Sequence, residues 1–149
     1  MFKELDDINT FGAVITIVFY ILAILVFIFR IANKDKASMV IGALILCLSV
    51  PLIWLLLKAS EFDRPLLYYV QIILVLIWII FTLIADYILK WDFRKIRRMV
   101  IIYVTFYFAA SGGLLGIAAE AGQVWTVVSV LLFFFMAVLA FVQRHITGK

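Results

Sequence analysis

Cysteine and histidine are almost absent from this sequence of 149 residues, which contains only Cys47 and His145. A single cysteine excludes a disulfide within the chain and a cysteine-rich metal site. A single histidine excludes a haem held by two histidines of one chain and a zinc site built from several histidines. We therefore expect no cofactor and no metal ion.

Charged side chains are absent from the middle of the long apolar runs. All Asp, Glu, Lys and Arg residues lie between these runs or near their ends. The polar side chains at mid-depth are Tyr20, Ser49, Trp78, Thr105, Tyr107 and Ser111. A serine without a histidine or lysine beside it is a poor nucleophile. We predict no catalytic residues and a protein that is not an enzyme.

Five apolar runs fill most of the chain, over residues 11–31, 39–57, 66–89, 99–119 and 124–142. Each has about the ~20 residues with which an α-helix crosses a bilayer. Hydrophobic residues make up 68% of the chain, compared with ~45–50% in a soluble domain. The sequence predicts an all-α, polytopic transmembrane helical bundle, with one domain of five spans over residues 1–149.

Basic residues are unevenly divided between the two sides that five spans define. One side has three: Lys3, Lys58 and Arg64. The other side has ten: Arg30, Lys34, Lys36, Lys90, Arg94, Lys95, Arg97, Arg98, Arg144 and Lys149. Short loops rich in Lys and Arg stay in the cytoplasm. We expect the N-terminus outside, the C-terminus in the cytoplasm, and the protein in a bacterial inner (plasma) membrane. Because these cations face headgroups, we expect lipid and not nucleic acid as their partner.

Small residues follow helical spacing along the fourth run and form what we call the small-residue face. Its members are Ala109, Gly112, Gly113, Gly116 and Ala119. Gly112 and Gly116 form a GxxxG pair, and Ala109 and Gly113 form a second pair of small residues four apart. Such faces let two helix backbones approach closely. The sequence leaves open whether the partner helix belongs to the same chain or to a second copy.

The loop before the fourth run has the densest charge in the chain. We predict that it contacts anionic lipid headgroups or a protein partner through Lys90, Trp91, Arg94, Lys95, Arg97 and Arg98. An alternative is that the loop only sets the orientation of the chain. Asp86 precedes Lys90 by four residues, so on a regular α-helix the two would form a pair.

Two functions remain open after these exclusions. The leading hypothesis is a non-enzymatic membrane protein that acts through helix contacts in the bilayer, as an accessory or scaffold subunit or as a homo-oligomer. The alternative is a small transporter or channel for a neutral solute or an ion. Its possible pathway residues are Gln71, Glu120 and Pro51, and Pro51 is also expected to bend its helix.

Overall fold

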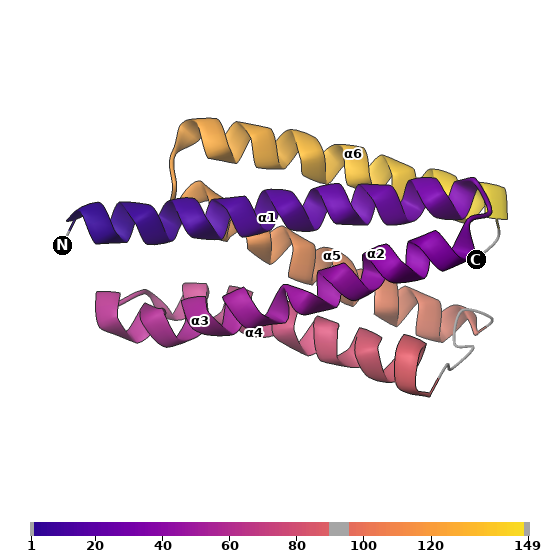
Figure 1. Cartoon of the computed structure of the whole chain (residues 1–149), viewed down its shortest axis with the longest axis horizontal. Helices are drawn as coiled ribbons and strands as arrows, with labels where there is room; N and C mark the ends of the chain where they lie inside the picture. Colours follow the sequence, from indigo (N-terminus) through magenta and orange to yellow (C-terminus); the bar gives the residue numbers. More distant parts are fainter. Residues whose placement is uncertain (1, 90–95, 148–149) are drawn as a thin grey trace.

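The computed structural model describes residues 2–89 and 96–147, and in these segments the protein consists of helices joined by short turns (Figure 1). The helices are α1 (Phe2–Ile31), α2 (Asp35–Cys47), α3 (Ser49–Ala59), a short 3₁₀ turn η1 (Ser60–Phe62), α4 (Leu66–Thr82), a π-helix η2 (Leu83–Ile88), α5 (Arg97–Ala119) and α6 (Gln123–Thr147).

Five helical segments are long and apolar enough to cross a membrane, as the sequence predicts. They cover Asp6–Ile31, Asp35–Phe62, Leu66–Ile88, Arg97–Ala119 and Gln123–Ile146. The prediction of an all-α fold with five span-length helices is confirmed for the described segments. Several helices extend beyond the apolar runs, because the apolar pattern marks residues suited to hydrocarbon and not the whole hydrogen-bonded helix.

The second span is broken near its middle. Helix α2 ends at Cys47 and α3 begins at Ser49, with Leu48 between them. The Leu48 N–H donates to the Ile45 carbonyl at 3.0 Å, which is a tighter turn than an α-helix makes. Pro51 lies three residues beyond this break and has no N–H to donate to the Cys47 carbonyl. The break lets α2 pack on α1 while α3 packs on α4 (Figure 1).

The third span changes helix type before it ends. The π-helix η2 continues α4, and the Leu89 N–H donates to the Ile84 carbonyl five residues back, at 2.8 Å. Asp86 therefore lies in a π-helical segment, and its predicted pairing with Lys90 stays a prediction. Lys90 itself lies outside the described residues.

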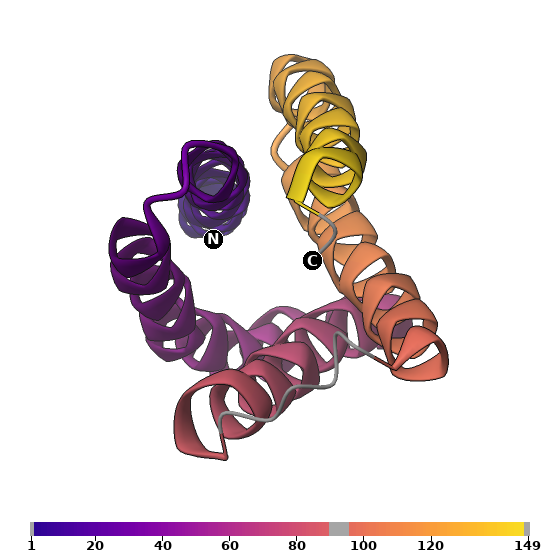
Figure 2. The same cartoon turned by 90° about the vertical axis from the view of Figure 1, so that its right-hand side faces the viewer.

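Helix α1 contains the most buried of the five span-length segments. It contacts α2, α3, α5 and α6. Half of the most apolar segment of α1 is buried, compared with 11% of the most apolar segment of α6. Figure 2 looks along the helices from the end where α1 finishes, with α6 at one edge of the bundle. We call this the basic end, and the end where α1 begins the N-terminal end.

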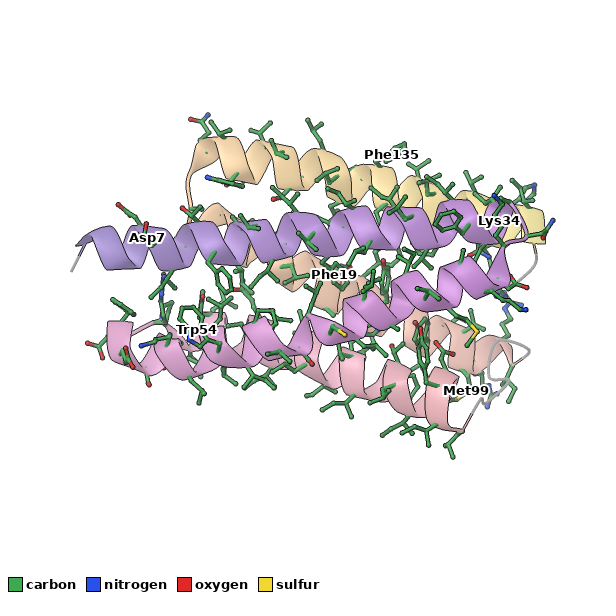
Figure 3. The ribbon with its side chains drawn as sticks, viewed as in Figure 1. Asp7, Phe19, Lys34, Trp54, Met99 and Phe135 are labelled. Carbon is green, nitrogen blue, oxygen red and sulfur yellow. The ribbon has the colours of Figure 1, made fainter. Side chains whose placement is uncertain are left out.

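The core is densest between mid-depth and the N-terminal end. Seven large side chains there are at most 1% exposed: Phe19, Tyr20, Leu52, Leu55, Ile72, Leu114 and Ile117. The Tyr20 hydroxyl donates to the Ser111 carbonyl, and the Thr16 hydroxyl donates to the Gly12 carbonyl at 2.9 Å. Phe19 from α1 reaches into this region (Figure 3).

Candidate functional site

A cavity of about 520 Å³ extends from the basic end to mid-depth. Residues of α1, α2, α4, η2, α5 and α6 line it, with Ala23 and Trp78 at mid-depth and Ser38 and Arg144 near the basic end. Its volume is within the ~300–1,000 Å³ of small-molecule sites, and such sites are mostly apolar with a few polar groups. Figure 3 labels Lys34 and Met99 at this end of the bundle, and Asp7 and Trp54 at the opposite end.

Three residues of the third span line the cavity at successive turns. Trp78 and Thr82 lie four residues apart on α4, and Asp86 follows on η2. The Trp78 and Thr82 side chains are buried, at 4% and 8% exposure. Yet the Trp78 indole Nε1 and the Thr82 hydroxyl have no hydrogen-bond partner. Buried polar groups are nearly always paired, so these two are exceptions. Each atom has less than 1 Å² of accessible surface, so neither is open to the cavity itself.

Aromatic rings form much of the deeper wall. The Trp78 ring centroid lies 5.2 Å from that of Tyr107 and 6.5 Å from that of Tyr103. Phe27 meets Tyr107 edge to face at 6.3 Å. The Tyr107 hydroxyl contacts the Met136 sulfur at 2.9 Å, so this hydroxyl has a partner. The wall therefore presents ring surfaces, and rings of a ligand can stack or pack edge to face against them.

The mouth of the cavity is polar and held by two cross-helix contacts. The Arg30 Nε donates to the Ser38 hydroxyl at 3.3 Å, and the Tyr87 hydroxyl donates to the Met39 carbonyl at 2.8 Å. A Cβ at Gly42 would lie 2.5 Å from the Tyr87 hydroxyl oxygen, so a glycine there makes room for this contact. Asp86, Gln143 and Arg144 also line the cavity.

The N-terminal end is closed by contacts of Arg64, whose side chain is 7% exposed. Its guanidinium donates to the Asn9 side-chain oxygen and lies 3.5 Å from the Glu120 carboxylate. It also lies 4.8 Å from the centroid of the Tyr68 ring. Arg64 thus joins α1, the loop before α4 and the turn after α5. We call Asn9, Arg64, Tyr68 and Glu120 the Arg64 cluster.

The predicted pathway residues do not line the cavity. Glu120 belongs to the Arg64 cluster. Gln71 packs against α5, where its amide nitrogen would lie 2.0 Å from a Cβ added at Gly116. Pro51 lies on α3, which packs on α4. The three residues therefore have separate surroundings.

The small-residue face divides between two surfaces. A Cβ at Gly113 or Gly116 would meet Gln71 of α4, so these two glycines pack inside the chain. Gly112 has no atom within 4 Å of such a Cβ, and Ala109 and Ala119 are exposed. The fully buried face of α5 is a neighbouring one, which includes Ala110, Ser111 and Leu114. One part of the predicted face thus contacts α4, and the other part faces outward.

The basic residues predicted to bind lipid or a partner fall largely outside the described segments, as Lys90, Trp91, Arg94 and Lys95 do. Arg97 and Arg98 open α5 and are exposed. Neither lines the cavity. The contact of this loop with anionic headgroups stays a prediction.

Sequence reasoning missed the residues that line the cavity. It considered Trp78 and Asp86 separately, placed Arg30 at a span end, and did not consider Thr82. The available signal was the spacing of four that puts Trp78, Thr82 and Asp86 along one side of a helix. Within the described part of the chain, no three His, Cys, Asp or Glu residues lie close enough to hold a metal ion. No protein-family model, curated protein or solved structure matches the chain.

Proposed function

We propose that this chain is a non-enzymatic membrane protein that binds a small, largely apolar molecule in the cavity at its basic end. The observation that carries the proposal is a cavity of about 520 Å³ that is lined by aromatic rings at mid-depth and by polar side chains at its mouth. Pockets of this size with a mostly apolar lining and a few polar groups are typical of small-molecule sites. A bound molecule would fill the cavity and pack against the rings.

The chemistry of the lining supports binding over catalysis. The Thr82 hydroxyl has no hydrogen-bond partner, so no general base is positioned to activate it as a nucleophile. The Tyr107 hydroxyl is directed to the Met136 sulfur. These groups suit recognition of a ligand.

A matched pair of substitutions on α6 tests the proposal. Ala140 lines the cavity, whereas Val138 is 58% exposed and does not. Ala140→Phe should fill part of the cavity, and Val138→Phe should only add surface facing lipid. Native mass spectrometry of the protein from gently solubilised membranes should show a retained small molecule on the wild type and Val138→Phe, and less of it on Ala140→Phe. Equal retention by both variants would contradict a site in this cavity.

A second candidate is the scaffold or homo-oligomer, and one observation favours it. Ala109, Gly112 and Ala119 are small residues on the outward side of α5, where another helix could approach closely. In the same mass spectra, this candidate expects two copies of the chain or a copurified protein. Gly112→Leu should then dissociate that complex.

A transporter would use the same cavity but needs one further event. The Arg64 cluster would have to separate, because Arg64 joins three parts of the N-terminal end. In either reading, our proposed orientation puts the basic end, and so the mouth of the cavity, on the cytoplasmic side.

A further inference from the structure

We infer that the cavity takes a single-chain amphiphile with an acidic headgroup, which enters from the bilayer between α5 and α6 and leaves its headgroup beside Arg144. This inference rests on the proposed function and names the class of ligand and its route. Four residues, which we call the lateral opening, line the cavity and are also exposed: Ile101, Thr105, Phe141 and Arg144.

The exposed part of the lining indicates where the cavity reaches the surface of the protein. The lateral opening belongs to α5 and α6, and its two apolar side chains, Ile101 and Phe141, are 56% and 64% exposed. The residues of α1 and α4 that line the cavity are buried or half-buried. The other exposed lining residue is Met39 of α2, near the mouth. The cavity is therefore most open on the side of α5 and α6.

Helices α5 and α6 diverge toward the basic end. A short turn joins them at the N-terminal end, and they separate toward the end where Arg97 begins α5 and Thr147 ends α6 (Figure 1, Figure 2). The Phe108 and Phe141 rings stack across the two helices, with centroids 6.0 Å apart. Phe108 lies eleven residues beyond Arg97, about 16 Å along a helix. Since the hydrocarbon core is ~30 Å thick, an opening in this stretch would face the lipid chains of one leaflet.

The interior of the cavity suits one apolar chain. Its deeper wall combines aliphatic side chains such as Ala23 and Val26 with the rings of Trp78 and Tyr107. The volume of about 520 Å³ is that of a site for one small molecule, so we expect one chain and not a whole phospholipid. A charge at mid-depth would be strongly disfavoured. The chain should therefore lie inward and the headgroup at the basic end.

The charges at the mouth favour an acidic headgroup. Among the described residues, the charged ones that line the cavity are Arg30, Arg144 and Asp86, so positive charges outnumber negative ones. Arg144 is exposed and lies in the last turn of α6, where lipid headgroups would surround it. A guanidinium binds a carboxylate or a phosphate through paired N–H donors. Both acidic groups share this chemistry.

The test uses Trp78 as a reporter, in the full chain with Trp54, Trp91 and Trp125 changed to Phe. Trp78 lines the cavity and is 4% exposed, and bromine on a lipid chain quenches tryptophan fluorescence only at short range. In nanodiscs of unbrominated phosphatidylcholine, the probes are 9,10-dibromooctadecyl phosphate and 9,10-dibromooctadecanol, which has the same chain and no charge. We expect both to quench Trp78 saturably, the alcohol at about fivefold higher membrane concentration.

Two matched pairs of variants test the headgroup contact and the route. Arg144→Gln should weaken binding of the phosphate about fivefold and leave binding of the alcohol unchanged. Arg98→Gln, which removes an exposed cation outside the lining, should change neither. Thr105→Phe should narrow the lateral opening and slow quenching by both probes. Ile102→Phe, at an exposed position of α5 that does not line the cavity, should leave the rate unchanged.

Four results would overturn the inference or part of it. Equal binding of the phosphate and the alcohol would remove the acidic class, and the proposed function would stand. Quenching by dibrominated phosphatidylglycerol as strong as that by the single-chain phosphate would replace the class with a whole phospholipid. Equal rates for Thr105→Phe and Ile102→Phe would remove the route between α5 and α6. If no probe quenches Trp78, the inference fails, and the proposed function fails with it only if Ala140→Phe retains as much small molecule as Val138→Phe.

Discussion

Three glycines of α5 offer a matched series, because one substitution meets different surroundings at each. A Cβ at Gly116 would lie 2.0 Å from the Gln71 amide nitrogen and 2.8 Å from its Cδ. A Cβ at Gly113 would lie 3.4 Å from the Gln71 Cα and 3.5 Å from its carbonyl oxygen. A Cβ at Gly112 would meet nothing within 4 Å. We predict that leucine destabilises the protein at Gly113 and Gly116 and not at Gly112.

The expected sizes follow from what has to move. Leucine at Gly113 extends toward the backbone of α4, which a side-chain rotation cannot relieve. Overpacking of this kind costs about 1–3 kcal/mol of unfolding free energy. Leucine at Gly116 first displaces the end of the flexible Gln71 side chain, so we expect the lower part of that range. At Gly112 the gain in helix propensity over glycine, roughly 0.8 kcal/mol, should leave the protein as stable as the wild type or more so.

The assay is reversible unfolding of each purified variant in mild detergent, followed by circular dichroism. The gain in helix propensity is common to all three variants, so it cancels from the differences between them. If the Gly112→Leu variant is monomeric and as unstable as the Gly113→Leu variant, the reasoning from added Cβ atoms is refuted. Loss of stability at Gly112 only when the protein is at high concentration would instead reveal a contact between copies.

Three further predictions concern orientation, the Arg64 cluster and the basic loop. In a Cys47→Ser background, Glu61→Cys should react with an impermeant maleimide on intact cells and Lys34→Cys only after permeabilisation; the reverse pattern would overturn the orientation. Arg64→Met should lower the unfolding free energy by about 1.5–3 kcal/mol, because it removes the charge-assisted hydrogen bond to Asn9 and the ion pair with Glu120 from a buried side chain. Lys58→Met, which removes the exposed pair with Glu61, should lower it by under ~1 kcal/mol, and equal losses would contradict a structural role for Arg64. Changing Arg94, Lys95 and Arg97 to Gln should weaken retention of anionic lipid by about 1 kcal/mol per charge at low salt, as measured by lipid mass spectrometry; unchanged retention would leave the loop as an orientation signal.

The five spans could be predicted because their cause is local. A chain crossing hydrocarbon must pair its own backbone groups, and an apolar run of about ~20 residues has one common way to do so. The break in the second span has a local component as well, since Pro51 removes a donor. The π-helix of the third span has no such marker: residues 79–89 contain neither proline nor glycine. The π-helix positions the Tyr87 hydroxyl to donate to the Met39 carbonyl on α2. This contact depends on a residue of another helix, so the sequence of residues 79–89 alone does not predict it.

The small-residue face predicts one property of helix packing and leaves another undetermined. It predicts that helix backbones can approach closely, and Gly113 and Gly116 do meet α4 at Gln71. The pattern contains no information on the partner of each residue, because that depends on how α5 is rotated within the bundle. The rotation buries Ala110, Ser111 and Leu114 instead of Ala109. The side chains that fill those buried positions are small or branched and resemble the rest of the run.

The Arg64 cluster and the cavity both depend on residues far apart in sequence, which is why neither could be predicted. Asn9 and Arg64 are 55 positions apart, and all five spans contribute to the lining of the cavity, from Ala23 in the first to Arg144 in the fifth. Periodicity within one helix fixes which side chains share a face. It does not fix which faces meet.

Most buried polar groups outside the cavity are paired within the fold. At the N-terminal end, the buried guanidinium of Arg64 has Asn9, Glu120 and the Tyr68 ring as partners. Nearer mid-depth, Tyr20, Thr16 and Ser111 donate to backbone carbonyls. The exceptions among the described residues are the Trp78 indole N–H and the hydroxyls of Thr82 and Ser129, each buried and without a partner. Ser129 lies away from the cavity, so an unpaired buried group does not by itself mark a ligand site. It is the volume and the aromatic lining of the cavity that support a bound molecule.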